Sequence, residues 1–104
     1  MAPLTRPVLA GTALRDAVRS VMRRHLEPAS CDVFLFGSEA EGRATPRSDI
    51  DVGVLGPAAM PGAVMQRLRD ELEQLRTLRS FDLVDFSLVD ERFRKEALRH
   101  AEHL

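Results

Sequence analysis

Three short apolar segments alternate along the chain with three amphipathic helical patterns. The apolar segments are of strand length and cover residues 31–36, 50–55 and 81–88. Apolar residues recur at helical spacing over residues 12–26, where Thr12 is the candidate N-cap, and over residues 61–79. A third helix begins after Asp90, a predicted N-cap. Such alternation is typical of α/β and α+β domains. We therefore expect a small mixed β-sheet of about three strands with flanking helices.

The length of 104 residues is that of one domain, which we expect to span residues 1–104. The longest early and central stretches without a charge, residues 7–14 and 52–66, are too short to span a membrane. No secretory signal is recognisable, so we expect a cytoplasmic protein. The net charge of -1 argues against direct nucleic-acid binding through counterion release.

Most single residues with reactive or aromatic side chains have ordinary structural interpretations. The lone cysteine cannot form an internal disulfide and fits a small core position. We expect the histidines at the surface, the phenylalanines in the core, and the arginines of the first helix facing water or a partner. These residues are Cys31; His25, His100 and His103; Phe34, Phe36, Phe81, Phe86 and Phe93; and Arg15, Arg19, Arg23 and Arg24.

The chemistry-bearing motif is a Gly-Ser pair followed, after ten intervening residues, by Asp-x-Asp. Gly37-Ser38 ends one apolar segment, and glycine allows the sharp turn that presents backbone N–H groups to a phosphate. Asp49 and Asp51 are two apart on a predicted strand, so they point to the same face. Paired carboxylates on an apolar strand are best tolerated around a cation such as Mg²⁺.

Each half of this motif is common by itself. A Gly-Ser pair is most often an ordinary turn, and Asp-x-Asp is often a solvated strand edge. Both together, each adjoining its own apolar strand, favour a phosphate site beside a divalent metal, which is what phosphoryl or nucleotidyl transfer requires.

Residues 37–52 resemble the signature of the DNA polymerase beta-like nucleotidyltransferase superfamily, specifically its minimal members. Residues 81–85 resemble the third metal-binding strand of that family. The resemblance implies that Gly37 and Ser38 contact the triphosphate of ATP. It also implies that Asp49, Asp51 and Asp82 are catalytic carboxylates that hold two Mg²⁺ ions.

The motif departs from the family pattern at one position. Many members have Ala-Arg-Gly shortly after Gly-Ser, whereas this chain has Ala40-Glu41-Gly42. The change puts an anion near the expected phosphates and puts activity or nucleotide preference in doubt. Arg43 and Arg47 are the candidates to supply the missing positive charge to the nucleotide.

Asp82 and Asp85 compete for the role of third metal ligand. On a strand their side chains point to opposite faces, and both faces carry apolar residues, so periodicity does not choose between them. The family pattern, in which the carboxylate precedes two aliphatic residues, favours Asp82. Asp85 is then expected to be a hydrogen-bonded or solvated strand residue.

Minimal nucleotidyltransferases of this size resemble antitoxins paired with HEPN-domain toxins, and the resemblance implies transfer of AMP to a toxin tyrosine. Two alternatives remain: a small-molecule enzyme like the aminoglycoside nucleotidyltransferases, and an antitoxin that acts by contact alone. The chain beyond this core is too short for a separate acceptor-binding domain. A chain of this size buries roughly 65% of its unfolded surface, so we expect a hetero-complex or a homo-oligomer.

Overall fold

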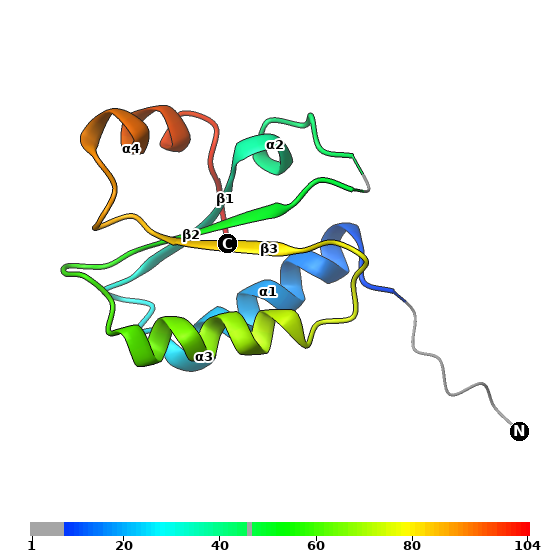
Figure 1. Cartoon of the computed structure of the whole chain (residues 1–104), viewed down its shortest axis with the longest axis horizontal. Helices are drawn as coiled ribbons and strands as arrows, with labels where there is room; N and C mark the ends of the chain where they lie inside the picture. Colours follow the sequence, from blue (N-terminus) through cyan, green and yellow to red (C-terminus); the bar gives the residue numbers. More distant parts are fainter. Residues whose placement is uncertain (1–7, 46) are drawn as a thin grey trace, which may run out of the picture.

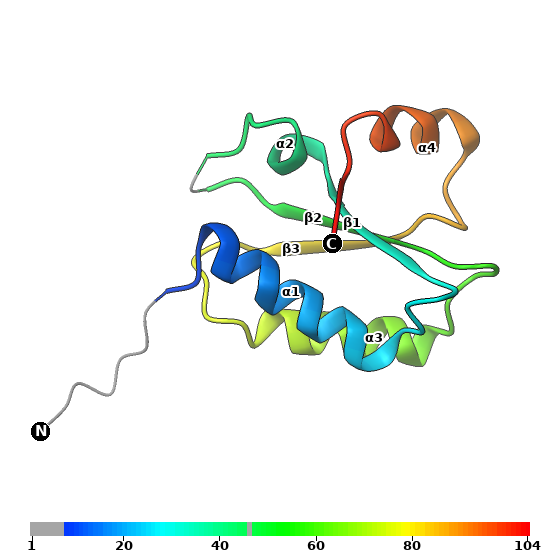
Figure 2. The same cartoon turned by 180° about the vertical axis from the view of Figure 1, so that it is seen from behind.

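The computed structural model describes residues 8–45 and 47–104, which form a four-stranded sheet between two layers of helices. Helices α1 and α3 cover one face of the sheet, and α2 and α4 lie on the other (Figures 1 and 2). The elements are α1 (Gly11–His25), β1 (Asp32–Phe36), α2 (Gly37–Ala40), β2 (Ile50–Leu55), α3 (Gly62–Glu73), β3 (Phe81–Asp85), α4 (Glu91–Leu98) and β4 (Glu102–His103). The expected mixed α/β architecture is thus confirmed.

The strand order is β3-β2-β1-β4. Strand β1 pairs antiparallel with β2 and β4, whereas β2 and β3 are parallel because α3 carries the chain back across the sheet. In this register Asp51 pairs with Phe36 on one side and with Asp82 on the other. The topology therefore brings the end of β1 and the starts of β2 and β3 to the same edge of the sheet.

The main core lies between the sheet and the apolar faces of α1 and α3. Strands β1 and β2 contribute side chains that point toward these helices. Its most buried members include Val18, Met22, Val33, Val52, Val54, Leu68 and Leu72. A smaller cluster of Phe34, Phe36 and Phe86 lies on the other face, under α4. Because the aromatic cluster occupies only part of this face, the strand ends that carry Asp51 and Asp82 stay accessible.

Gly53 lies in the middle of β2, where a side chain would overlap the aromatic cluster. A Cβ built there would be 2.6 Å from the Phe34 Cζ atom and 2.9 Å from the Phe86 Cε1 atom. We expect Gly53→Ala to lower the free energy of unfolding by about 1–3 kcal/mol, the usual cost of overpacking a core. Urea denaturation measures this cost. Gly62→Ala, where a Cβ meets nothing within 4 Å, is the control and should not destabilise the protein; equal stability of both variants would contradict the packing described.

Several predicted boundaries are wrong in detail. The helix expected over residues 61–79 ends at Glu73, and the strand expected to reach residue 88 ends at Asp85. Thr12 is not an N-cap, because α1 begins at Gly11 after Ala10, which provides no side-chain cap. The Asp90 cap is confirmed, since its carboxylate accepts a 2.7 Å hydrogen bond from the Phe93 amide. The short elements α2 and β4 were not predicted.

Two of the surface and core predictions also need correction. Phe93 is 44% exposed, so it is not a core residue, although its ring contacts the aromatic cluster. Of the α1 arginines, Arg19 and Arg24 are exposed as expected, whereas Arg15 and Arg23 are only half-exposed. Arg15 is bonded to Glu39 and Glu102, and Arg23 donates to two backbone carbonyls, those of Cys31 and Leu104. These partners lie outside α1 and are therefore invisible to a helical pattern.

Across the two described ranges, no helix has both the length and the apolar character that a membrane crossing requires.

Candidate functional site

The Gly-Ser corner and the Asp-x-Asp strand meet directly in the fold. Gly37 has φ 69°, a left-handed conformation that side chains with a Cβ rarely adopt. A Cβ on Gly37 would also overlap the Asp51 carboxylate. Glycine is therefore needed here for two reasons, and its absent side chain lets the backbone turn lie against the carboxylate of the neighbouring strand.

Asp82 completes this corner from the other side of β2. Asp51 and Asp82 are register partners on parallel strands and point to the face that carries α2 and α4. Both line a cavity of about 390 Å³, together with Phe36, Gly37, Glu41, Phe93, Glu96 and Ala97. All the charged side chains in this lining are carboxylates, so the cavity has a strongly negative potential.

The electrostatics of Asp51 fit a site for a divalent cation. Burial, followed by the charges of Asp82 and Asp49, raises the pKa of the Asp51 carboxyl, and Arg79 opposes this effect. Carboxylate oxygens are the ligands that Mg²⁺ prefers, and a cation between them would relieve the repulsion. No group of three or more histidine, cysteine or acidic side chains is arranged to hold a metal within residues 8–45 and 47–104. Asp51 and Asp82 form a carboxylate pair at the cavity, and a cation held by such a pair would have coordination positions left for phosphate oxygens and water.

The raised pKa of Asp51 predicts that its ionised form destabilises the fold in the absence of metal. This destabilisation begins as the pH rises past the ordinary value of 3.8 and is complete once the pH exceeds the raised pKa. We expect Asp51→Asn to have a higher Tm than the wild type at pH 7 in EDTA. We also expect Mg²⁺ to raise the Tm of the wild type more than that of the variant.

Thermal unfolding followed by circular dichroism checks both expectations. The exposed Asp70 of α3 accepts a hydrogen bond from Gln66 that asparagine can retain. Asp70→Asn is therefore a matched control, which should change neither the Tm in EDTA nor the rise of the Tm with Mg²⁺. A lower Tm for Asp51→Asn in EDTA would contradict the electrostatic description of the site.

Asp85, the competing carboxylate, is occupied by structural hydrogen bonds on the other face of β3. It is only 6% exposed and accepts bonds from the Met60 amide, 2.7 Å, and from the amide and hydroxyl of Ser87, 2.9 and 2.7 Å. Burial raises the pKa of Asp85, but the bonds from Met60 and Ser87 outweigh it and the net direction is down. Asp85 therefore anchors the segment before α3 and the turn after β3.

The remaining residues predicted from the motif are not all gathered in the cavity. Asp49 is exposed and directly precedes β2, close enough for its charge to act on Asp51. Ser38 is the second residue of α2, and its carbonyl accepts from the Arg43 amide at 2.9 Å. Arg43 and Arg47 are exposed on the loop between α2 and β2, outside the cavity lining.

Glu41, the residue that departs from the family pattern, is partly neutralised by its neighbour. The Arg43 Nη2 atom lies 3.1 Å from the Glu41 Oε2 atom in an exposed ion pair. Glu41 lines the carboxylate cavity together with Gly37. Arg43 therefore offsets the negative charge that Glu41 brings to the cavity.

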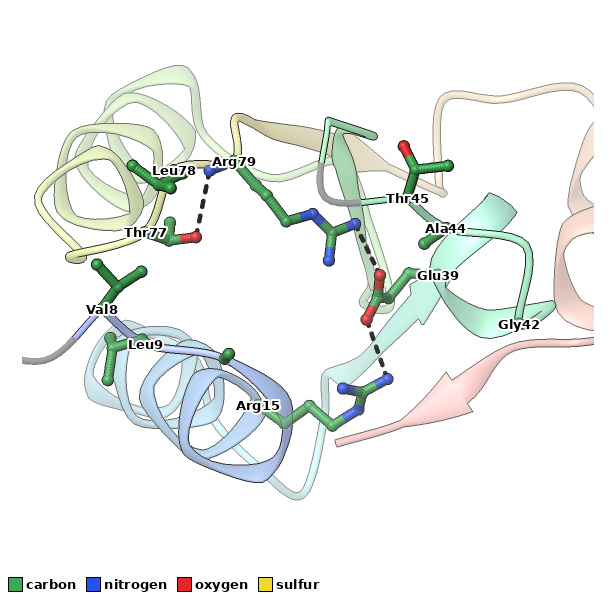
Figure 3. Close-up of a pocket in the computed structure, with 11 residues that line it drawn as sticks. Val8, Leu9, Arg15, Glu39, Gly42, Ala44, Thr45, Thr77, Leu78 and Arg79 are labelled. Atoms are coloured by element: carbon green, nitrogen blue, oxygen red, sulfur yellow. Dashed lines mark hydrogen bonds and ion pairs between the residues drawn. The ribbon is translucent and has the colours of Figure 1, made fainter.

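Four residues near the site had no signal in the sequence. Glu96 and the exposed Phe93 come to the cavity from α4, far along the chain from the motif. Glu39 and Arg79 form an ion pair behind the Gly-Ser corner, in a second hollow shown in Figure 3. That hollow contains neither Asp51 nor Asp82, so the carboxylate cavity is the candidate for chemistry. Pairs separated by about forty residues cannot be read from local patterns.

The comparisons with known proteins agree with this geometry. The family model described as "Polymerase beta, Nucleotidyltransferase" matches residues 19–104. No curated protein sequence matches the chain. Among solved structures, a protein described as a minimal nucleotidyltransferase is 32% identical, with a TM-score of 0.69; the match covers 86% of this chain and 88% of that one.

More distant structures share the fold. A chain of a toxin–antitoxin structure with AMP-PNP is 21% identical, with a TM-score of 0.66 and coverage of 85% of this chain and 69% of that one. A chain of the complex of a tri-AMPylated Shewanella oneidensis HEPN toxin with its MNT antitoxin is 18% identical, with a TM-score of 0.61 and coverage of 86% and 67%. Together with the match over residues 19–104, the Gly37-Ser38 corner facing Asp51 and Asp82 leads to one conclusion: the chain belongs to the polymerase beta nucleotidyltransferase family.

Proposed function

We propose that the protein is a Mg²⁺-dependent antitoxin that transfers AMP from ATP to a tyrosine of a partner HEPN toxin. The observation that carries this proposal is the placement of Asp51 and Asp82 side by side on parallel strands, with the Gly37 backbone against Asp51. The choice of AMP and of a toxin partner is supported by the similarity to chains of the AMP-PNP and AMPylated toxin–antitoxin structures.

The nucleotide half of the site is assigned to the corner and the following loop. In the proposal, the backbone of Gly37 and Ser38 binds the triphosphate, and Arg43 and Arg47 supply positive charge from the loop. Asp51 and Asp82, with Asp49 at the edge, would hold two Mg²⁺ ions. Ions bound there would supply charge that lowers the pKa of the acceptor hydroxyl and that stabilises the departing pyrophosphate.

The acceptor half of the site is assigned to α4. The acceptor oxygen forms a bond to the α-phosphorus of ATP, the bond from that phosphorus to the β-phosphate oxygen breaks, and pyrophosphate leaves. Phe93 is 44% exposed at the cavity wall, with its ring centroid 6.1 Å from that of Phe36. An exposed ring beside the reacting carboxylates is a suitable packing surface for a tyrosine side chain.

Two other functions have a specific observation in their favour. The carboxylates of Glu41 and Glu96, added to Asp51 and Asp82, would also attract a polycationic small molecule such as an aminoglycoside. The position of Glu41, where many relatives have arginine, is compatible with an antitoxin that neutralises its partner by contact alone.

Incubation with labelled ATP and Mg²⁺ separates the three functions. One reaction contains the product of the neighbouring gene, which we expect to be a HEPN-domain protein, and a parallel reaction contains an aminoglycoside. We expect label on a tyrosine of the HEPN protein and none on the aminoglycoside. Label on the aminoglycoside alone would establish the small-molecule enzyme. A stable complex with the HEPN protein and no transfer would establish the contact antitoxin and overturn the proposal.

A further inference from the structure

A chain of alternating charges, Arg15, Glu39 and Arg79, lies next to the Gly-Ser corner, with Glu39 between the two guanidinium groups (Figure 3). We propose that Arg79 and Glu39 form a clasp that holds the Gly37-Ser38 corner in its triphosphate-binding position, which makes Arg79 a positioning residue for the nucleotide. This inference rests on the proposed function, because it assigns a role in binding the nucleotide of that reaction.

Helix α2 needs an anchor of this kind. It contains only residues Gly37–Ala40, none of which is buried, and its N-cap provides no side-chain hydrogen bond. A single turn of helix is unstable without tertiary contacts, because nucleation costs more than one or two backbone hydrogen bonds return. Glu39 is the residue of this turn that makes charged contacts, and its side chain is only 11% exposed.

Arg79 connects this turn to the strand that carries the aspartates. Its Nη2 atom lies 2.7 Å from the Glu39 Oε2 atom, and its Nε donates a 2.9 Å hydrogen bond to the carbonyl of Ser48, the residue directly before Asp49. The next residue, Ser80, accepts a 2.8 Å bond from the Ile50 amide. One guanidinium group therefore contacts Glu39, which follows the Gly-Ser half of the motif, and Ser48, which precedes the Asp-x-Asp half, at the point where β2 and β3 begin.

The contact between Arg79 and Glu39 is mainly electrostatic and depends on both charges. The two facing atoms, Arg79 Nη2 and Glu39 Oε2, are buried and have no well-directed hydrogen bond within the described part of the chain. The contact with Arg79, opposed by burial and reinforced by the charges of Arg79 and Arg15, lowers the pKa of the Glu39 carboxyl. Glu39 is thus ionised at neutral pH. Loss of Glu39 leaves the buried Arg79 guanidinium without its counter-charge, and loss of Arg79 leaves the buried Glu39 carboxylate with Arg15 as its ion-pair partner.

Arg15 holds the same carboxylate from the opposite side of the hollow. Its Nη2 atom is 3.2 Å from Glu39 Oε1, and its Nε and Nη2 atoms are 2.5 and 3.1 Å from the Glu102 carboxylate of β4. The clasp is therefore fixed to both α1 and the sheet edge. Because Arg79 and Glu39 do not line the carboxylate cavity, they would act on the nucleotide through the position of the corner.

The test compares Arg79→Met, the isosteric Glu39→Gln and the double variant with the wild type. Arg19→Met is the matched control, because Arg19 forms an exposed ion pair with Asp16, 3.0 Å, elsewhere on α1. Hydrogen exchange of the Glu41 and Arg43 amides, which bond to the carbonyls of Gly37 and Ser38, reports on the corner in the nucleotide-free protein. Isothermal titration with ATP and Mg²⁺ reports on binding.

We expect both single variants to exchange these amides about tenfold faster and to bind Mg–ATP about tenfold more weakly. Exchange in the core strand β1 should not change in these variants, and the control should match the wild type. The double variant should exchange these amides no faster, and bind Mg–ATP no more weakly, than Arg79→Met, since it removes both charges of the clasp. If Arg79→Met does not fold, the Glu39→Gln variant provides the same comparison.

Unchanged exchange at these two amides would overturn the clasp. Faster exchange with unchanged Mg–ATP affinity would overturn the positioning role while leaving the proposed function intact. A wild-type protein that does not bind Mg–ATP would contradict the proposed function and the nucleotide role of the clasp, whereas the exchange rates would still decide whether the clasp holds the corner.

Discussion

Replacing Asp82 with asparagine is expected to abolish nucleotide transfer and leave the fold intact. Asp82 is exposed and faces Asp51 across the strand pair, so the substitution removes a proposed metal ligand and also relieves like-charge repulsion. We expect a loss of activity on the order of a hundredfold or more, as for other groups that stabilise transition-state charge. The Tm should be equal to that of the wild type or slightly higher.

Asp85→Asn is the matched variant on the same strand and should have the opposite effect. An amide nitrogen cannot accept the bonds that the Asp85 carboxylate receives from Met60 and Ser87. We expect a loss of about 1–3 kcal/mol of stability, the cost of leaving buried donors unsatisfied. Activity of the folded fraction should remain. In the wild type the pKa of Asp85 is lowered, so the ionised carboxylate stabilises the fold at neutral pH. This stabilisation should decline as the pH falls below about 4.

Transfer assays and urea denaturation of the two variants test this assignment together. An inactive but stable Asp85→Asn protein beside an active Asp82→Asn protein would move the third ligand to Asp85. Full activity in both would remove the third carboxylate from the site.

Gly37→Ala should have the second large effect, on both stability and nucleotide binding. The substitution forces a Cβ into a left-handed conformation and into the Asp51 carboxylate. We expect a loss of about 2–4 kcal/mol of stability, which combines the conformational and steric costs. Nucleotide binding should be lost as well, because the corner or Asp51 has to move.

Gly42→Ala separates the two costs. Gly42 has φ 72°, close to that of Gly37, but a Cβ there meets nothing within 4 Å. Its substitution should therefore cost about 1–2 kcal/mol and leave nucleotide binding nearly unchanged. Urea denaturation and calorimetry measure the two effects. Identical behaviour of the two variants would show that the contact between Gly37 and Asp51 is not essential.

The sequence was sufficient for the parts of the fold that repeat a local pattern. The strand around Val33 follows from a continuous apolar run, because β1 is buried on both faces. The amphipathic face of α1 follows from the period of 3.6 residues that packing against one side of the sheet imposes. The family, too, could be recognised from a contiguous motif. The C-terminal ends of α3 and β3 could not be predicted from the sequence, because the apolar spacing continues at Leu75 and Leu88 after the backbone has already turned.

The site was only partly predictable for a related reason. Gly37, Asp51 and Asp82 belong to recognisable motifs, and the register places them together. Glu39 and Arg79 are ordinary charged residues whose importance comes from a contact across the fold. Phe93 was expected in the core because it is aromatic, whereas its position at the cavity wall depends on how α4 packs on the sheet. The role of these three side chains depends on where the fold places them and not on their residue type.

Calorimetric titration of the protein with ATP is the most direct test of the proposed site. It should be carried out with Mg²⁺ and with EDTA, for the wild type and for the Asp49→Asn/Asp51→Asn double variant. If Gly37, Asp51 and Asp82 form a metal–nucleotide site, the wild type binds ATP with Mg²⁺, and binding is lost or much weaker in EDTA and in the double variant. Equal ATP affinity in both proteins, with or without Mg²⁺, would contradict the assignment of a metal–nucleotide site to these residues.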